Sequence, residues 1–300
     1  MIKARGLTKR FGDVVAVNDL SFDVEPGRVT GFLGPNGSGK TTTMSMIMGL
    51  DRPTSGSVTI FDQHYRDLRW PLREVGGLLE ARAIHPGRSA RSHLWSLAQY
   101  NDIAKSRVDE VLEIVGLSAV SRKRVGKFSL GMGQRLGIAA ALLGDPAVVL
   151  LDEPVNGLDP EGIRWMRTLC KSLAGEGRTV FISSHMMAEM ALTADQLVVI
   201  GQGRLIAEMP VADFVARSST QSFRVRVASS ESFPDAVQKA GGTALVEVDG
   251  TMTISGMDAQ AIGDLALSLG VAVYELTALA SLEDAFMELT GGSVEFGAAR

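Results

Sequence analysis

The chain has 300 residues and a mass of 31.9 kDa, with 45% hydrophobic and 21% charged residues, which fits about two folded domains and excludes an intrinsically disordered chain. Thirty basic and 34 acidic residues give a net charge of −4 without a long block of like charges, so no nucleic-acid partner is expected. No apolar run reaches the roughly 18–20 residues that a membrane span needs, which predicts a cytosolic chain unless a partner holds it at a membrane.

The first 217 residues alternate short β-branched runs with glycine-rich turns and helical patterns. This alternation is typical of an α/β domain built around a mostly parallel sheet. The pattern predicts a strand over 29–33, a helix over 41–48 and a helical insertion over about 82–143. Further along, Cys170 lies among apolar residues on a helical pattern, which predicts a buried thiol, and a single cysteine excludes an internal disulfide framework.

A phosphate-binding loop is predicted directly after the strand over 29–33. The loop matches the pattern G-x-x-x-x-G-K-[ST] at every fixed position and consists of Gly34, Pro35, Asn36, Gly37, Ser38, Gly39, Lys40 and Thr41. Its glycines allow backbone N–H groups to turn toward phosphate oxygens, and the start of the next helix adds positive potential. We expect Lys40 to reach the β- and γ-phosphates, Thr41 to offer its hydroxyl to Mg²⁺, and Thr42 to join the nucleotide site.

Two carboxylates follow a second buried strand. The continuous apolar run over 147–151 predicts a strand that is buried on both faces, and Asp152 and Glu153 come directly after it. Ligands of such sheets bind beyond the carboxyl ends of the strands. We therefore expect Asp152 to hold Mg²⁺ through water and Glu153 to polarise the attacking water, as in phosphoryl transfer.

The pattern changes at Ser222, where apolar and basic residues begin to alternate. A strand, a short helix from Pro234, two strands that flank Asp249-Gly250, a helix, a strand and a final helix over 281–289 are predicted in turn. This β-α-β-β-α-β order predicts a ferredoxin-like α+β accessory domain over 218–290. The pair Asp249-Gly250 predicts a two-residue type I′ turn.

The C-terminal part contains no histidine or cysteine, so a transition-metal site is not expected there. Residues 291–300 are predicted to form a flexible tail. Reinforcement of a dimer and regulation both remain open as roles for the accessory domain.

A further segment, which precedes the strand over 147–151, resembles the signature of ATP-binding cassette (ABC) ATPases: Phe128-Ser129-Leu130-Gly131-Met132-Gly133-Gln134-Arg135. Three more segments are similar to the D-loop, the switch histidine and the adenine-stacking aromatic of this family: Asn156-Gly157-Leu158-Asp159, Ser183-Ser184-His185 and Phe11-Gly12. The resemblance covers about residues 1–217, with six motifs in the family's order. It implies an ABC nucleotide-binding domain that hydrolyses Mg²⁺-bound ATP.

The resemblance also implies a dimer. Ser129 is a favourable cap for the predicted helix over 130–143, whose positive end suits an anion. In the family the signature meets the nucleotide of the opposite subunit, so Ser129, Gly131 and Asp159 are expected to contact ATP there and two copies to sandwich two ATP molecules head to tail. The strand over 180–182 is expected to place His185 near the γ-phosphate, at the same sheet edge as Asp152.

Two residues depart from the family pattern. Leu130 stands where the commonest signature has glycine, and Glu80 stands where most members have glutamine. An ionised carboxylate only accepts hydrogen bonds and could meet Mg²⁺ or its water, with added negative charge near ATP. With the segment 85–91, these departures make the chain resemble the bacterial drug and bacitracin exporter branch.

The resemblance implies an ATPase subunit at the cytoplasmic face of the membrane, held there by a separate transmembrane permease that exports a drug or a peptide antibiotic. The insertion over about 82–125 is expected to touch the permease. An importer ATPase and a non-transport ABC ATPase remain alternatives. A P-loop GTPase or kinase is disfavoured, because the chain lacks a guanine-specifying N-K-x-D sequence and residues 128–135 would be unexplained.

Overall fold

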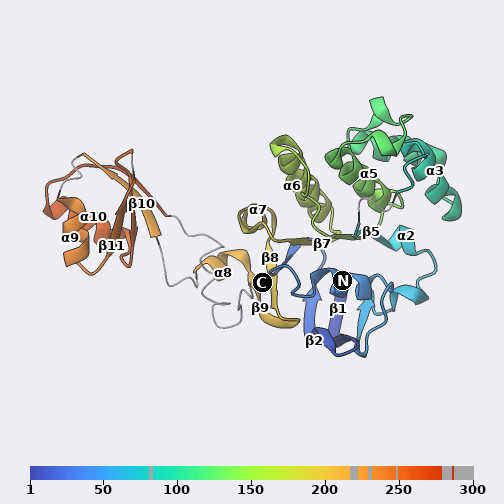
Figure 1. The fold of residues 1–300 in the computed structure, drawn as a ribbon, viewed down its shortest axis with the longest axis horizontal. Coiled ribbons are helices and arrows are strands. Elements are labelled where there is room, and N and C mark those ends of the chain that lie inside the picture. Colours follow the sequence, from blue (N-terminus) through green and yellow to red (C-terminus); the bar gives the residue numbers. More distant parts are fainter. Residues whose placement is uncertain (81–83, 217–221, 229–231, 248, 279–285, 287–300) are drawn as a thin grey trace. The chain divides into compact units, whose positions relative to one another are not determined.

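The computed structural model describes residues 1–80, 84–216, 222–228, 232–247, 249–278 and 286 (Figure 1). The chain divides into two compact units, Met1–Val211 and Ala212–Arg300. Apart from Phe286, the predicted final helix lies outside the described residues, as does the predicted tail. Among the described residues we find no helix with the length and hydrophobicity of a membrane span.

The first unit contains a small antiparallel sheet of three strands. Its strand order is β2-β1-β4, with β1 at Ile2–Phe11, β2 at Val14–Val24 and β4 at Ser55–Ile60. Ile2, Ala4 and Leu7 of β1 are fully buried, because this sheet covers one face of the larger sheet with its apolar side.

The larger sheet has six strands in the order β5-β6-β7-β3-β8-β9. They are β5 (Val75–Leu78), β6 (Val148–Leu151), β7 (Thr179–Ser184), β3 (Val29–Leu33), β8 (Gln196–Gly201) and β9 (Arg204–Pro210). The first five are parallel, and only β9 runs antiparallel to its neighbour β8. Every residue of β3, β6 and β7 is buried. The prediction of an α/β domain around a mostly parallel sheet is confirmed.

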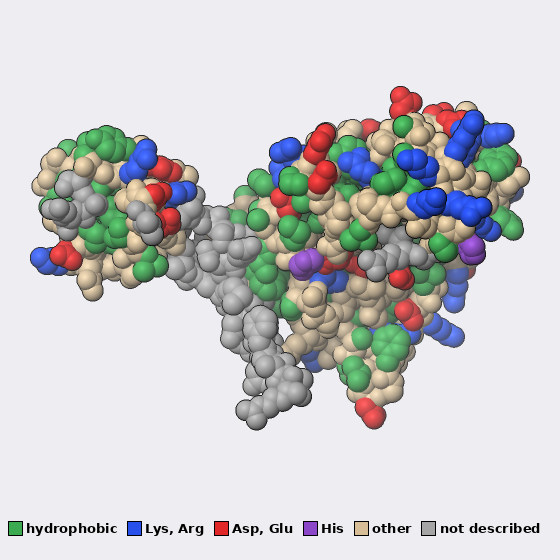
Figure 2. All heavy atoms as spheres, turned by 45° about the horizontal axis from the view of Figure 1, so that its top comes forward, with side chains coloured by type: hydrophobic (Ala, Val, Ile, Leu, Met, Phe, Trp, Pro, Cys, Tyr) green, Lys and Arg blue, Asp and Glu red, His purple; other side chains and the backbone are tan. Residues whose placement is uncertain are grey.

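Seven helices of the first unit accompany these sheets among the described residues: α1 (Lys40–Ile47), α2 (Pro71–Glu74), α3 (Ala90–Tyr100), α4 (Lys105–Ile114), α5 (Leu130–Leu142), α6 (Pro160–Gly175) and α7 (Met187–Thr193). Helix α8 (Val211–Ala216) begins at the boundary between the two units. Short 3₁₀ turns lie at Tyr65–Asp67, Ser118–Val120 and Val125–Lys127. Helices α3, α4 and α5 pack on one another within the predicted insertion. Lys and Arg side chains gather over this helical region (Figure 2).

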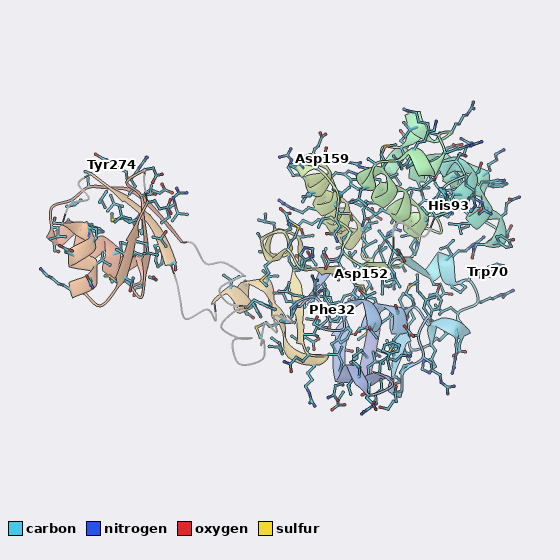
Figure 3. All side chains as sticks on the ribbon, in the orientation of Figure 1. Phe32, Trp70, His93, Asp152, Asp159 and Tyr274 are labelled. Carbon is cyan, nitrogen blue, oxygen red and sulfur yellow. The ribbon has the colours of Figure 1, made fainter. Side chains whose placement is uncertain are left out.

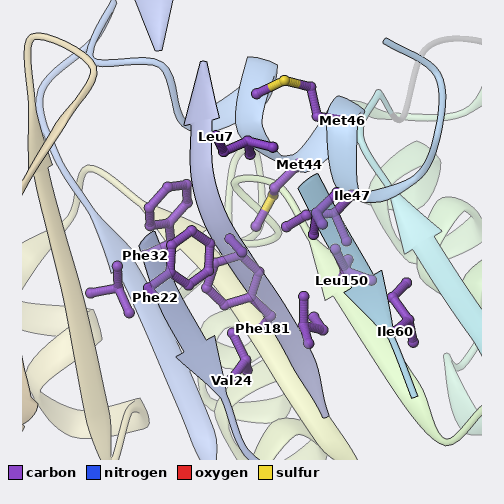
Figure 4. Packing of buried hydrophobic residues seen from close by; sticks show 14 of the residues in the cluster. Leu7, Phe22, Val24, Phe32, Met44, Met46, Ile47, Ile60, Leu150 and Phe181 are labelled. Atoms are coloured by element: carbon purple, nitrogen blue, oxygen red, sulfur yellow. The ribbon is translucent and has the colours of Figure 1, made fainter. Parts of the chain in front are cut away.

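Three phenylalanine rings join the two sheets of the first unit (Figure 4). Phe22 of β2 lies 5.6 Å from Phe32 of β3 and 5.7 Å from Phe181 of β7, and the last two rings are 5.0 Å apart, measured between ring centroids. Such offset aromatic packing adds to the gain from burial. The cluster therefore fixes β3 and β7 next to each other, and both strands end at the site described below.

The second unit has a four-stranded antiparallel sheet in the order β11-β12-β10-β13. Its elements are β10 (Ser222–Val227), α9 (Phe233–Lys239), β11 (Thr243–Val246), β12 (Met252–Ser255), α10 (Ala259–Ser268) and β13 (Val273–Ala278). Phe223, Val225 and Ile254 are buried between sheet and helices. This element order with this strand order is the split β-α-β arrangement, so the ferredoxin-like prediction is confirmed.

The predicted two-residue turn at Asp249-Gly250 is wrong. Glu247 N–H donates to Thr251 O at 2.8 Å, so three residues separate the last paired positions of the hairpin. Gly250 has a φ of 80°, and its N–H donates to Glu247 O at 3.0 Å, so the turn is not confined to Asp249 and Gly250. The physical reason is the Asp249 carboxylate, which accepts a hydrogen bond from Thr251 N–H at 3.0 Å and stabilises a longer turn.

Candidate functional site

The carboxyl ends of adjacent parallel strands carry most of the residues that the sequence singled out. β3 leads into Gly34, β6 into Asp152 and β7 into His185. The register pairs Leu33 with Ser184 and Leu151 with Ile182, so these ends lie at one edge of the sheet. Figure 3 shows Asp152 at this edge, above the core residue Phe32. Ligands of open α/β sheets bind at this edge.

The predicted phosphate loop forms a cradle between β3 and α1. Gly37 and Gly39 have φ angles of 79° and 101°, which only glycine adopts readily. A Cβ on Gly39 would lie 2.5 Å from Ala16 O, so a larger residue would not fit. The Ser38 hydroxyl is buried without a hydrogen-bond partner among the described residues. A ligand with acceptor oxygens would supply that partner.

A cavity of about 410 Å³ opens over this loop. It is lined by Phe11, Ala16, Asn36, Gly37, Gly39, Lys40, Thr41, Thr42 and Glu153. The structure thus brings seven of the predicted nucleotide-binding residues and the predicted base together at one cavity. The Phe11 side chain is half-exposed, with Lys9 Nζ 4.8 Å from its ring centroid, so a face of the ring is open to a planar ligand.

Lys40 is almost fully buried at the start of α1. Its Nζ donates to Gly34 O at 2.6 Å and to Pro35 O at 3.2 Å. Burial lowers the pKa of Lys40, while the charges of Glu153 and Asp152 act in the opposite direction. A buried ammonium group of this kind is stabilised when an anion such as a phosphate binds next to it.

Thr41 and Asp152 form the candidate magnesium site. Thr41 Oγ1 donates to Asp152 Oδ2 at 2.6 Å, and Ser183 Oγ donates to Asp152 Oδ1. Asp152 is only 8% exposed. A hydroxyl and a carboxylate are the hard oxygen donors that Mg²⁺ takes from proteins, with phosphates and waters completing its shell. These residues therefore fit the ion.

Glu153 occupies a strained turn directly after β6. Its φ of 49° is left-handed, which is uncommon for a residue with a Cβ. Ser183 Oγ accepts from Glu153 N–H at 2.9 Å, and Gln134 Nε2 donates to Glu153 O at 3.2 Å. These contacts hold the backbone in a conformation that a free chain would avoid.

The Glu153 carboxylate lies between two polar partners. His185 Nδ1 donates to Oε2 at 2.7 Å, and Lys40 Nζ lies 3.8 Å from Oε1. Because the carboxylate is the acceptor, the Nδ1 atom of His185 carries the proton and Nε2 is left for another contact. The Glu153 side chain is 19% exposed, so it can still reach a ligand or a water in the cavity.

The signature residues lie elsewhere on the same unit. Ser129 caps α5, and its hydroxyl accepts from Met132 N–H at 3.2 Å. Asp159 caps α6 in the same way, accepting from Gly162 N–H at 2.8 Å. Both residues are exposed, and neither they nor Gly131 line the cavity over the phosphate loop. The structure does not bring them to this chain's own phosphate loop.

Glu80 is exposed two residues beyond β5. It makes no hydrogen bond or ion pair with another residue of the described chain, and so the structure does not join it to Thr41 or Asp152. By contrast, Ser183 and Gln134 received no individual role from the sequence, although Ser183 Oγ donates to the Asp152 carboxylate and Gln134 Nε2 donates to the backbone oxygen of Glu153. Matching the ends of the two strands over 147–151 and 180–182 could have indicated Ser183. Gln134 belongs to the signature segment, but no local signal indicated its hydrogen bond to Glu153 O.

Three family models match the sequence. The model described as ABC transporter matches residues 17–156. A model described as a domain of unknown function, DUF8746, matches residues 221–283 in the second unit. A model described as AAA domain, putative AbiEii toxin, matches residues 124–191, which overlap the first match.

The bacitracin transport ATP-binding protein BcrA of Bacillus licheniformis is 46% identical over 213 residues, which cover 70% of each chain. The chain belongs to the ABC transporter family. The likeness of this ABC protein to its relatives is not confined to the first unit. YhcH of Bacillus subtilis (strain 168), an uncharacterized ABC transporter ATP-binding protein, is 35% identical over 304 residues, which cover 98% of this chain and 97% of YhcH.

A solved structure agrees with the sequence relation. The ABC cassette MJ0796, described as a dimer in a post-hydrolysis state bound to ADP and Pi, is similar with a TM-score of 0.64 and 25% identity over 70% of this chain and 99% of that chain. The predictions of the ABC family, its fold and its ATPase activity are confirmed. This ABC protein is an ATP-hydrolysing subunit of a transporter.

Proposed function

We propose that this ABC ATPase binds ATP and Mg²⁺ at the phosphate loop, and that two copies closing head to tail drive a separate membrane permease that exports a peptide antibiotic. The relation to a bacitracin transport protein over 213 residues supports the substrate class. The dimeric MJ0796 cassette supports the pairing of two copies. The permease would hold the subunit at the cytoplasmic face of the membrane.

The observation that carries the catalytic part is the position of the Glu153 carboxylate between Lys40 and His185. A carboxylate there is suited to accept a proton from a water molecule at the cavity. As the water oxygen forms its bond to the γ-phosphorus, the bond from that phosphorus to the bridging oxygen breaks, ADP leaves and the proton passes to Glu153. The hydrogen bond from His185 Nδ1–H orients the Glu153 carboxylate. Among the described residues, no side chain or backbone group forms a hydrogen bond with His185 Nε2, so this atom could contact the γ-phosphate.

Charge on the phosphates would be met from three sides. The phosphate loop offers its backbone N–H groups and the start of α1. Lys40 offers a buried ammonium group. Thr41 and, through water, Asp152 would hold Mg²⁺, which would neutralise further charge on the phosphate oxygens.

The remaining predicted residues complete this proposal. Phe11 would stack on the adenine ring, because it lines the same cavity with an open face. Ser129, Gly131 and Asp159 would meet the ATP of the partner copy, since they are remote from this chain's own phosphate loop. Glu80, which contacts neither Thr41 nor Asp152 in the described chain, would meet the magnesium ion or its water, as the family resemblance implies.

A glutamine at position 153 tests the catalytic part. We expect Glu153→Gln to bind ATP, to form an ATP-dependent dimer and to lose turnover by at least about a hundredfold, because the amide cannot take the proton. Glu161→Gln, at an exposed position in the first turn of α6, is the matched control and should behave as wild type. Wild-type turnover in Glu153→Gln would refute the assignment of the base.

The transport part needs the native host. Tagged Glu153→Gln protein, solubilised gently with Mg²⁺ and ATP, should co-purify with a polytopic membrane protein in stoichiometric amount. Deletion of the gene should lower resistance to bacitracin and raise its accumulation in the cell. An ATP-dependent dimer without any membrane partner would instead favour a non-transport ATPase, and lower accumulation after deletion would favour an importer.

A further inference from the structure

One ion pair behind the catalytic groups has no part in the proposed chemistry. Arg167 Nη2 of α6 donates to Glu189 Oε2 of α7 at 2.8 Å. The two side chains are 26% and 23% exposed, so the pair is partly shielded from water. Arg167 Nε is buried without a partner among the described residues, which leaves Glu189 as the group that neutralises this guanidinium.

Helix α7 depends on contacts of this kind for its position. It has seven residues and no side-chain cap at its start, and a helix this short is not stable by itself. Met190 provides one anchor, because Gly31 of β3 leaves room for it: a Cβ on Gly31 would lie 2.3 Å from Met190 Sδ. Glu189 provides the other anchor through Arg167. The first fixes α7 to the sheet and the second fixes it to α6.

The position of α7 determines the position of the His185 backbone, because hydrogen bonds join both ends of this short segment. Met186 is the residue that precedes α7, and its carbonyl accepts from Met190 N–H at 3.1 Å. Met186 N–H in turn donates to Ser184 Oγ at 2.9 Å at the end of β7. His185 lies between these two residues, and its side chain is 46% exposed. Its ring is therefore held mainly by its backbone and by Glu153.

The ion pair between Arg167 and Glu189 also connects α7 to the helix that follows the predicted D-loop. That helix begins at its cap Asp159, which belongs to the predicted D-loop. Arg167 lies about two turns further along α6, and its ion pair with Glu189 connects α6 to α7. The ion pair thus links the helix that follows the D-loop to the helix that follows His185.

We propose that Arg167 and Glu189 are positioning residues that hold His185 in hydrogen-bond contact with Glu153. The inference rests on the proposed function, because it assumes that this contact serves ATP hydrolysis. Neither side chain lines the cavity over the phosphate loop, so neither touches the reacting atoms. Loss of the pair is expected to loosen α7 and to misplace the imidazole.

Glu189→Gln tests this role with almost no change of shape. We expect kcat for ATP to fall about tenfold and KM to stay within about twofold, because small misplacements of catalytic groups cost rate and leave substrate binding intact. Arg167→Glu should lose at least as much. The double reversal Arg167→Glu with Glu189→Arg restores an ion pair and should recover most of kcat.

The imidazole itself gives a second measurement. The chain has only four histidines, so ¹⁵N spectra of the side chains are simple and His185→Gln identifies the His185 signals. In wild type we expect the pattern of an Nδ1–H tautomer, and in Glu189→Gln an average of both tautomers. Glu176→Gln is the matched control. Glu176 lies at the C-terminal end of α6, and its Oε2 is 2.8 Å from Arg178 Nη2. Loss of this ion pair should leave kcat and the His185 signals unchanged.

The outcomes of these experiments distinguish failure of the proposed function from failure of the positioning role. Full turnover in Glu153→Gln would overturn the proposed function, whatever the ion-pair variants do. An inactive Glu153→Gln together with wild-type kcat and unchanged His185 signals in Glu189→Gln would overturn only the positioning role. Lower kcat in Glu189→Gln without recovery in the double reversal would also count against it, since a positioning pair must tolerate exchange of its ends.

Discussion

Thr41 Oγ1 donates a hydrogen bond to Asp152 Oδ2 across 2.6 Å, although 111 residues separate them. Thr41 lies on α1 after β3, and Asp152 lies after β6. The two strands are separated only by β7, whose Ser183 hydroxyl bonds the other oxygen of Asp152. The sheet thus positions the two residues that we propose as oxygen donors to Mg²⁺.

Asp152→Asn should weaken the magnesium site and leave nucleotide binding largely intact. The amide keeps an oxygen of similar shape but removes the negative charge that a hard cation requires. We expect the Mg²⁺ concentration for half-maximal ATPase activity to rise at least about tenfold. Titration of activity with Mg²⁺ measures this effect, with Asp145→Asn on the exposed loop after α5 as the control. An unchanged Mg²⁺ requirement would contradict the assignment of Asp152.

Lys40→Met should change the pH dependence of stability. Burial lowers the pKa of Lys40 below its ordinary value of 10.5, so at neutral pH the charged amine costs the folded state free energy relative to the unfolded chain. That cost disappears as the pH rises toward 10.5. Without nucleotide, wild type should therefore gain stability relative to Lys40→Met over this range.

Thermal unfolding at a series of pH values measures this difference. Lys171→Met, at an exposed position of α6, serves as the control. If the difference in stability between Lys40→Met and wild type stays constant up to pH 10.5, burial does not lower the pKa of Lys40.

Leu130 and Gly157 should be coupled energetically. A Cβ on Gly157 would lie 2.3 Å from Leu130 Cδ2, so the leucine fills the space that a larger residue at 157 needs. Gly157→Ala should cost about 1–3 kcal/mol in the free energy of unfolding, from this overlap and from its φ of 76°. The cost should be smaller by about 1 kcal/mol in a Leu130→Ala background. A double-mutant cycle by urea unfolding measures the coupling, and additive effects would show that the two residues are independent.

Cys170 should be unreactive in the folded protein. Burial raises the pKa of its thiol from 9.0 to about 12, so almost no thiolate is present at pH 8. Iodoacetamide should label Cys170 only after denaturation, as followed by mass spectrometry. Because the unfolded chain loses this proton at lower pH than the folded chain, the thiol's contribution to stability is complete below pH 9 and is lost as the pH rises toward 12. Labelling of the native protein at the rate of a free thiol would contradict this burial.

Phe11→Ala should weaken ATP binding by about tenfold, because stacking of a base on an aromatic ring contributes roughly 1–3 kcal/mol. Phe11→Trp should keep the affinity, since tryptophan offers a larger face. Fluorescence titration with a labelled ATP analogue gives both values. Equal affinity of Phe11→Ala and wild type would remove Phe11 from the nucleotide site.

Much of the fold and of the candidate site could be predicted from local sequence. Lys40 and Thr41 stand in a loop whose glycines are spaced for one backbone conformation, and Asp152 and Glu153 end an apolar run long enough for a buried strand. The ferredoxin-like unit followed from alternation and order alone. The hairpin at Asp249 was mispredicted because a side-chain hydrogen bond to Thr251 outweighed the preference of the Asp-Gly pair.

The sequence by itself thus determined which residues carry chemistry and which strand each of them follows. Only the tertiary structure decided that Ser183 binds the Asp152 carboxylate and that Gln134 binds the backbone of Glu153. It also decided that Glu153 meets His185 and that Glu80 does not meet Asp152. The reason is that parallel strands pair in the order β5-β6-β7-β3, which differs from their order along the chain. Side-chain packing between distant segments, such as the rings of Phe22 and Phe181, selects this order, and no local pattern records it.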